Sequence, residues 1–296
     1  MEQYGIQEMT FLGGFHNQIY LAKHQEKPII IRKTTKSGRR TLQEIQAEID
    51  LLKTLHPLGF TIRPYEINGQ SILVLADDVY VLFEHVAGKQ WFEFDHSDET
   101  YALAGKQLAL LHQTFHNLSP ISRLTYDQHP DLLLLKKHPI LEAEWNRIHA
   151  IIESWPKHKN EYGLIHGDYL YSNILYHDHG QTILDFDDCE YHFYLYDIAV
   201  YLFYYLLGGN PKRMDLEENQ LLFQTFISHY QEHNPSIHLD FKKLPVLFRL
   251  RQLKLAATIL ESEAIKPLGR WQKDFLELTF HQIQHQQDFV PIFFKQ

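Results

Sequence analysis

Cysteine is almost absent from this chain of 296 residues, because Cys189 is its only one. A single thiol cannot form an internal disulfide, and it rules out a zinc site built on several cysteines. The chain also does not open with a charged segment, an apolar segment and a small-residue cleavage site. We therefore expect a cytoplasmic protein in a reducing compartment.

Long apolar runs and positive charge are also scarce. No stretch reaches the roughly 18 uninterrupted apolar residues of a membrane-spanning helix, and the nearest, residues 191–207, contains His192 and Asp197. Lys and Arg number 28 against 37 Asp and Glu, which gives a net charge of -9. Nucleic acids are held by clustered Lys and Arg. We expect neither a membrane nor a nucleic acid as partner, and the acidity mildly favours a cationic small molecule.

The composition predicts a large core, with 44% hydrophobic residues in a chain near the length at which one core stops growing. We expect an α+β fold of two lobes, a small β-rich lobe over residues 1–87 with one helix and a larger, mainly α-helical lobe over residues 88–296. Expected strands are residues 18–22, 28–32, 72–75 and 80–83, then 173–176 and 182–186. Expected helices are residues 41–55, 100–115, 194–207, 217–233, 241–263 and 271–286.

The strongest chemical signal lies in the one non-helical region of the second lobe. His166-Gly167-Asp168 is followed by Asn173, and Asp185 comes twelve residues later at the expected end of a strand. Carboxylate and amide oxygens suit a hard cation such as Mg²⁺. In phosphoryl transfer one Asp accepts the proton of the acceptor hydroxyl, while an Asn and another Asp hold metal on the phosphates. We expect Asp168 to be the catalytic base and Asn173 and Asp185 to be metal ligands.

These motifs resemble the aminoglycoside phosphotransferase and choline kinase family, which includes a type of homoserine kinase. In that family the metal Asp opens an Asp-aromatic-acidic segment, as Asp185-Phe186-Asp187 does, and a later Asp, matched by Tyr196-Asp197, begins a helix that braces the catalytic loop. The resemblance covers most of the chain. It implies a protein-kinase-like fold, ATP and Mg²⁺ as cofactors, a small-molecule hydroxyl as acceptor, and structural roles for His166, Asp187 and Asp197.

The first lobe supports the same resemblance. Gly13, Gly14 and Asn17 lie in a segment similar to the family's nucleotide loop, where glycines let backbone N–H groups approach phosphates. As a bare glycine pair, however, the segment is also typical of a hairpin turn.

The strand that follows contains Ile29-Ile30-Ile31-Arg32, in the place of the V-A-I-K segment of kinases. Strand alternation puts Ile30 and Arg32 on one face, where both are expected at the nucleotide, with Arg32 on its phosphates. Lys33 then points to the other side, as a solvated charge. The helix partner of Arg32 is expected to be Glu48, and Glu44 is the competing choice.

The segment from Tyr80 to Gly88 resembles the kinase hinge, whose backbone groups bind adenine. Glu84 and Val86 are therefore expected to contact the nucleotide, although an ordinary strand edge is the alternative.

Four carboxylates, Asp185, Asp187, Asp188 and Glu190, lie within six residues, more than Mg²⁺ needs. Strand alternation puts Asp185 and Asp187 on the same side, which leaves Asp188 and Glu190 to bind a protonated amine of the acceptor. The rings of Tyr191, Tyr194 and Tyr196 are expected to offer faces for this cation. The alternative is that the acids are solvated and the tyrosines belong to the core.

Other interpretations are less favoured. The pairs His112/His116 and His281/His285 have helical spacing, but the first lacks the Glu of a zinc protease, so we expect no structural zinc. A pseudokinase or a protein Ser/Thr kinase remains an alternative, although the chain lacks the H-R-D, D-F-G and A-P-E segments. The sequence does not distinguish among acceptors, between ATP and GTP, or between a monomer and a homodimer.

Overall fold

The computed structural model describes residues 1–14, 17–35, 40–89, 97–178, 180–207, 216–263 and 266–289, with the side chains of 216–219 left out. The chain forms two compact units. The first, here called the sheet unit, comprises Met1–Phe94, Ser119–Arg123 and Ser172–Asp187. The second, the helical unit, comprises Asp95–Leu118, Leu124–Tyr171 and Asp188–Gln296. The sheet unit thus includes two segments from later in the chain, while the boundary after residue 87 stays a prediction.

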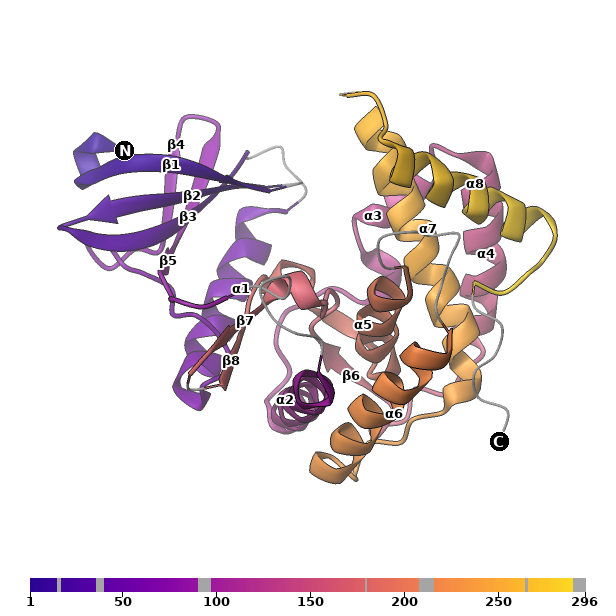
Figure 1. The fold of residues 1–296 in the computed structure, drawn as a ribbon. Helices are drawn as coiled ribbons and strands as arrows, with labels where there is room; N and C mark the ends of the chain where they lie inside the picture. The colour runs from indigo at the N-terminus through magenta and orange to yellow at the C-terminus, as the bar shows by residue number, and fades with distance from the viewer. Residues whose placement is uncertain are drawn as a thin grey trace. The chain divides into compact units, whose positions relative to one another are not determined.

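The sheet unit is built on five antiparallel strands in the order β1-β2-β3-β5-β4 (Figure 1). The strands are β1 (Ile6–Gly13), β2 (Gln18–His24), β3 (Lys27–Thr35), β4 (Ile72–Leu75) and β5 (Asp78–Glu84). In the middle strand, Ile29 and Ile31 are fully buried in one apolar cluster, while Arg32 points to the opposite face. Alternation along β3 therefore separates the core face from the face that carries the buried cation.

Helix α1 (Leu42–Leu55) belongs to the same unit and starts where a local rule predicts. Thr41 and Glu44 form a capping box, because the N–H of Glu44 donates to Thr41 Oγ1 at 3.2 Å and the N–H of Thr41 donates to Glu44 Oε2 at 2.8 Å. The apolar face of α1 is buried, including Ile45, Ile49 and Leu52.

The hairpin of β7 (Ile174–His177) and β8 (Gly180–Ile183) also belongs to the sheet unit. The N–H of Ile183 donates to the carbonyl of Phe60 at 2.8 Å, and Lys89 exchanges two backbone hydrogen bonds with Tyr176. The strand expected over residues 182–186 ends early, at Ile183, because Asp185 takes a left-handed conformation with φ 59°.

The helical unit contains most of the helices. They are α2 (Asp98–Asn117), α3 (Asp131–Leu135), α4 (Pro139–Glu153), α5 (Leu195–Leu207), α6 (Leu216–His233), α7 (Leu244–Glu263) and α8 (Arg270–Gln284). Helix α7 lies in the middle of this unit and packs against α3, α4, α5 and α8 (Figure 1). Among the described residues, no helix is both long and apolar enough to cross a membrane.

A two-stranded antiparallel sheet of β6 (Tyr162–Ile165) and β9 (Glu190–Phe193) completes the helical unit. The sequence did not predict this pair. Ile165 lies opposite Glu190 in the register, so the sheet places the start of the His166 loop beside Glu190.

Candidate active site

The loop that contains Asp168 is held by Asp197, in the first turn of α5. The backbone N–H of His166 donates to Asp197 Oδ2 at 2.7 Å, and that of Gly167 donates to Oδ1 at 2.8 Å. Asp197 and His166 are both fully buried. Backbone bonds to a charged acceptor are among the stronger hydrogen bonds, so the loop is rigidly fixed within its unit.

Two further buried side chains, His112 and Tyr230, extend the contacts by which Asp197 holds the Asp168 loop, and we call these contacts together the brace. His112 Nε2 lies 3.0 Å from Asp197 Oδ2, and His112 Nδ1 lies 2.7 Å from the hydroxyl of Tyr230. Because a carboxylate only accepts, His112 donates from Nε2 and accepts the Tyr230 O–H at Nδ1. Burial raises the pKa of Tyr230 well above its ordinary value, which keeps this hydroxyl a donor.

Gly167 occupies a position that only glycine fits. Its φ is 82°, and a Cβ there would lie 2.1 Å from the carbonyl oxygen of Asp188. The Asp168 loop and the segment at Asp188 are therefore in backbone contact.

Asp168 itself remains partly exposed, with 22% of its side chain accessible. Its Oδ1 accepts a hydrogen bond from Arg251 Nη2 of α7, which also donates to the Tyr204 hydroxyl at 2.7 Å. The Arg251 guanidinium lies 4.9 Å from the centre of the Tyr204 ring. Arg251, itself held by Tyr204, gives the Asp168 carboxylate a fixed orientation.

Arg251 keeps its charge although it is buried. Burial lowers its pKa, but Tyr204 and Asp168 outweigh that effect and hold the pKa well above its ordinary value. Burial also raises the pKa of Tyr204, to about 12. Sequence reasoning missed both residues.

Of the two acids predicted for the acceptor, Glu190 is inaccessible. It is 1% exposed, and its Oε1 lies 3.6 Å from Nζ of the equally buried Lys254. Asp188 keeps 14% of its side chain exposed, 3.4 Å from His129 Nε2. Of the nearby tyrosines, Tyr194 and Tyr196 are buried, as the alternative interpretation expected, while Tyr191 is half-buried.

In the sheet unit, Arg32 pairs with Glu48 and not with Glu44. Arg32 Nη1 donates to Glu48 Oε1 at 2.9 Å, a second bond joins Nη2 and Oε2, and both side chains are almost fully buried. Burial lowers the pKa of Arg32, but the carboxylates of Glu48, Asp187 and Asp185 outweigh it and raise the pKa. Lys33 points away from this site, as expected, to Asp78 at 2.9 Å.

The two candidate metal ligands lie on adjacent segments of the same unit. The carbonyl of Asn173 accepts the N–H of Leu184 at 2.8 Å, one residue before Asp185. The Asp185 side chain is 47% exposed, with Oδ1 3.5 Å from Arg32 Nη1. An amide oxygen and an accessible carboxylate oxygen are donors that fit a hard divalent cation.

The turn after Asp185 corrects one sequence inference. Phe186–Asp188 is a 3₁₀ turn, so the expectation that strand alternation puts Asp185 and Asp187 on the same side is wrong. Asp187 is buried, and its Oδ1 lies 3.3 Å from Arg40 Nε. Arg123 donates to the carbonyls of Phe186 and Asp187 at 2.9 and 2.6 Å. The sequence did not single out either of these arginines.

The remaining nucleotide candidates lie along the sheet. Gly14 has φ 124°, and a Cβ there would lie 1.9 Å from the carbonyl oxygen of Asn17, so this turn requires glycine. Gly13 also has a positive φ, of 140°. Ile30 is half-buried in β3. Phe15 and His16, between the glycines and Asn17, lie outside the described residues.

The hinge candidates lie at the end of β5. The backbone N–H of Glu84 donates to the carbonyl of Arg63 at 2.9 Å, and Val86 follows the strand half-buried. Their contact with a nucleotide stays a prediction.

Comparisons with known proteins identify the fold and the family of this chain. Amicoumacin kinase of Bacillus subtilis (strain 168) is 24% identical over 290 residues, covering 91% of this chain and 84% of that protein. A solved amicoumacin kinase in complex with AMP-PNP, Ca²⁺ and Ami superimposes with a TM-score of 0.86 at 19% identity, over 98% of this chain and 93% of that one. The choline kinase of Streptococcus pneumoniae gives a TM-score of 0.65 at 15% identity, over 96% and 95%.

A microcompartment-associated aminopropanol kinase also shares the fold, with a TM-score of 0.69 at 21% identity over 94% of this chain and 93% of that chain. The predicted α+β, protein-kinase-like fold is thus confirmed. The family model described as "Phosphotransferase enzyme family" matches residues 9–225, most of the chain. The chain therefore belongs to the phosphotransferase enzyme family, as a kinase of small molecules.

Proposed function

We propose that the chain transfers the γ-phosphate of ATP to a hydroxyl group of a small molecule, with Mg²⁺ bound and Asp168 as the base. The observation that carries this proposal is the loop at Asp168, whose backbone is bonded to Asp197 while the Asp168 carboxylate stays partly exposed. A general base must reach the proton that it accepts. A partly exposed carboxylate on a rigid backbone meets that requirement.

Arg251 is the positioning residue for this base. Its bond to Asp168 Oδ1 and its contact with Tyr204 orient the carboxylate from a buried helix. As the acceptor oxygen bonds to the γ-phosphorus, its proton passes to Asp168 and ADP leaves. A rigidly oriented base keeps this proton transfer within hydrogen-bond reach.

We assign nucleotide and metal binding to residues of the sheet unit. Bound Mg²⁺ would neutralise charge on the phosphates, with Asn173 and Asp185 as its protein ligands. Arg32, held by Glu48, supplies a cation for the phosphates, and the turn at Gly13 and Gly14 supplies backbone N–H groups. Asn17, Ile30, Glu84 and Val86 complete the proposed nucleotide contacts. The solved amicoumacin kinase with AMP-PNP and Ca²⁺ supports the use of a nucleoside triphosphate and a divalent cation.

We further propose that the acceptor carries a cationic nitrogen as well as the reactive hydroxyl. Aminopropanol and choline, named in two structural relatives, both have these two groups. Asp188, partly exposed and in backbone contact with the Asp168 loop, is the residue that we assign to the cation. Glu190 is too deeply buried for this role, and its partner is Lys254.

Phosphate transfer to a panel of candidate acceptors tests the proposal. The parent chain and Asp168→Asn would be incubated with ATP, Mg²⁺ and either amicoumacin, aminopropanol, choline, ethanolamine, homoserine or an aminoglycoside, and products would be identified by mass spectrometry. We expect one amine-bearing acceptor to gain a phosphate with the parent only. ATP binding without transfer to any acceptor would instead support the pseudokinase alternative.

The amine contact has its own test, once an acceptor is found. The parent should prefer that acceptor over its deaminated analogue in kcat/KM by about 1.5–3 kcal/mol, the value of a charge-assisted hydrogen bond. Asp188→Asn should remove much of this preference. Equal use of both acceptors by the parent would contradict an amine site.

A further inference from the structure

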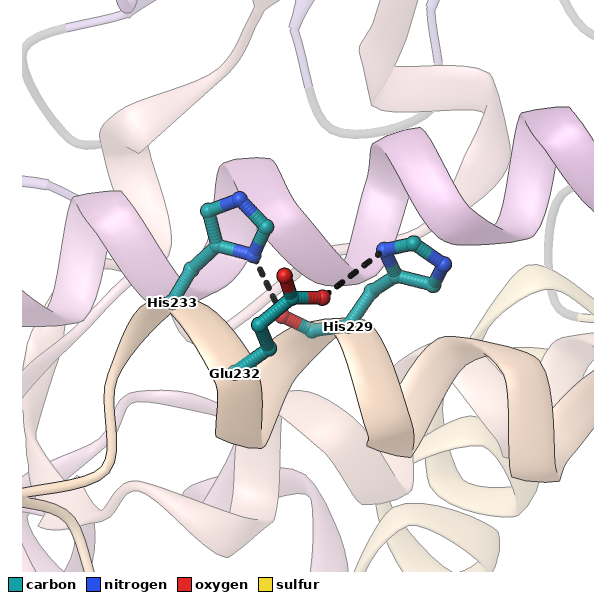
Figure 2. Close-up of side chains that lie close together, drawn as sticks. All are labelled: His229, Glu232 and His233. Carbon is teal, nitrogen blue, oxygen red and sulfur yellow. Dashed lines mark hydrogen bonds and ion pairs between the residues drawn. The ribbon is translucent and has the colours of Figure 1, made fainter.

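Three metal-ligating side chains lie together at the C-terminal end of α6, apart from the residues assigned to phosphate transfer. His229, Glu232 and His233 each offer one ligand atom, and these atoms lie within 4.8 Å of one another (Figure 2). His229 Nδ1 is 3.7 Å from Glu232 Oε2. The two imidazoles are nearly parallel, with 21° between their planes.

The spacing of these residues brings them to one face of the helix. Residues three and four positions apart are neighbours on a helix surface, so both histidines and the glutamate point the same way. The order His229-Tyr230-Gln231-Glu232-His233 matches the H-x-x-E-H pattern of zinc-binding helices, in which the two histidines hold zinc and the glutamate lies beside it. Imidazole nitrogens and a carboxylate oxygen are the donor set of many open zinc sites.

A hydrogen bond orients one of the rings. His233 Nδ1 lies 2.9 Å from the carbonyl oxygen of His229, and donation from this nitrogen leaves the lone pair for a metal on Nε2. Histidines that bind metal usually donate their other N–H to a carbonyl or carboxylate in this way. Figure 2 shows that this Nδ1 is the ring nitrogen turned toward Glu232, so metal binding at Nε2 would require the His233 ring to turn.

The side chains are accessible and able to close around an ion. His229 and Glu232 are 40% and 69% exposed. Ligands of a tetrahedral zinc ion at about 2.0–2.2 Å lie roughly 3.3–3.6 Å apart, and the distance of 3.7 Å from His229 Nδ1 to Glu232 Oε2 is close to that range.

Two other groups of residues in the helical unit share some of these properties but not the H-x-x-E-H pattern. In the cluster of His129, Asp131 and Asp188, the two ring nitrogens face different carboxylates, at 3.6 and 3.4 Å. One ligand atom from each of these three residues also lies within 4.8 Å of the others, but the imidazole lies between two acids, and Asp188 is the residue assigned above to the acceptor. The pair His281 and His285 has the same helical spacing as His229 and His233, but only Gln282, Ile283 and Gln284 lie between its members.

We propose that His229, Glu232 and His233 form a binding site for Zn²⁺ or a similar divalent transition metal, with water at the remaining positions. The site includes the turn that carries Tyr230, whose hydroxyl bonds His112 in the brace of the Asp168 loop. A bound ion would join successive turns at the end of α6 and so stabilise the turn that anchors this brace.

Direct zinc binding tests this site independently of phosphate transfer. Titration with Zn²⁺ at neutral pH, in excess Mg²⁺ to occupy oxygen-ligand sites, should show one site per chain in the parent. His229→Gln combined with His233→Gln should abolish that site. Glu232→Gln should weaken binding by about 10- to 100-fold, as the loss of a neighbouring carboxylate does at other metal sites. Saturating zinc should raise the melting temperature of the parent and not that of the double variant.

The matched control is His281→Gln with His285→Gln, a double variant that loses the same number of imidazoles from another exposed helix end. It should bind zinc as the parent does. The proposal is overturned if the parent binds no zinc, if the His229/His233 variant binds it unchanged, or if the control loses binding equally.

Discussion

The two units hold their candidate site segments by opposite kinds of contact. In the sheet unit, cationic side chains hold an acidic turn, since Arg123 donates to the carbonyls of Phe186 and Asp187 and Arg40 faces the Asp187 carboxylate. In the helical unit, an anionic side chain holds backbone amides, since Asp197 accepts the N–H groups of His166 and Gly167. Cationic side chains near the proposed metal ligand hold the first segment, and one fully buried carboxylate holds the second.

This difference indicates how each unit responds to ligands. The proposed phosphates and metal ion would change the charge around Asp185 and Arg32, so contacts in the sheet unit depend on what is bound. Asp197 and His112 are fully buried, and their bonds are already complete within the helical unit. We therefore expect changes in the sheet unit to alter nucleotide binding and changes in the helical unit to alter turnover.

Asp168→Asn should have the largest effect and should act on turnover alone. Loss of the proton-accepting carboxylate should lower kcat by about 10²- to 10⁴-fold while nucleotide binding stays unchanged. Steady-state kinetics and a nucleotide titration would measure the two quantities. Asp274→Asn, which removes a half-buried carboxylate of α8 that faces Arg270, is the control. Weaker nucleotide binding by Asp168→Asn would contradict the expectation that changes in the helical unit alter turnover and not nucleotide binding.

Glu48→Gln should mainly destabilise the sheet unit. It removes the acid that is hydrogen-bonded to the buried Arg32, and an unpaired buried charge costs about 3–5 kcal/mol of unfolding free energy. Urea unfolding would measure the loss, with nucleotide affinity expected to fall as well. Glu44→Gln, one turn earlier on the same helix, should lose only about 0.5–1 kcal/mol of capping energy. Equal losses in the two variants would contradict the pairing.

Asp185→Ala should weaken binding of the Mg²⁺-nucleotide complex by about 10-fold or more, since it removes a charged ligand beside a dication. Asn173→Ala should weaken it less, because only a neutral amide is lost. Titrations with a fluorescent nucleotide, with and without Mg²⁺, would separate metal-dependent binding from the rest. If Asp185→Ala binds the complex as tightly as the parent, the metal assignment is wrong.

Tyr230→Phe should have the smallest effect. It tests the brace at Tyr230, which is linked to the Asp168 loop through His112 and Asp197. It leaves His112 Nδ1 buried without its hydrogen-bond donor, which should lower the unfolding free energy by about 1–3 kcal/mol. Turnover should fall modestly and nucleotide affinity should not change. Tyr20→Phe, which loses a hydroxyl bonded to exposed Gln18, is the control for hydroxyl removal. A larger loss in Tyr20→Phe would argue against the brace.

Much of the fold followed from local rules in the sequence. The strand over residues 72–75 has the predicted bounds, and α1 begins after Thr41 because the capping box with Glu44 specifies that start. Alternation along β3 also separates Arg32 from the apolar face, as predicted. In each case the deciding interactions join residues close in sequence.

Sequence reasoning failed where contacts between residues far apart in sequence determine the local structure. β6 and β9 have four residues each and are stabilised by pairing with each other across a long separation, so neither has a strong local signal. The strand predicted through Phe186 ends at Ile183 instead, and Asp185 has a left-handed conformation with φ 59° that is incompatible with a continuing strand. Short-range propensity describes neither effect.

Arg251 was missed for a similar reason, since it contacts a residue 83 positions away in sequence. Helix α7 is buried on nearly all sides, so amphipathic spacing does not mark one functional face. One signal was nevertheless present. Arg249, Arg251 and Lys254 occur within an apolar helical stretch from residue 244 to 260 that has no acidic residue, and buried cations of this kind require partners elsewhere.

The close approach of Gly167 to Asp188 has a consequence for how this protein can evolve. A side chain at 167 would collide with the Asp188 backbone, so the main-chain spacing between these segments is set independently of the side chain at 188. Given the roles proposed above for Asp188 and Asp168, selection for a new acceptor could exchange the side chain at 188 while the geometry around the proposed base is retained. Under that proposal, proteins descended from this one could change their substrate without losing the catalytic geometry.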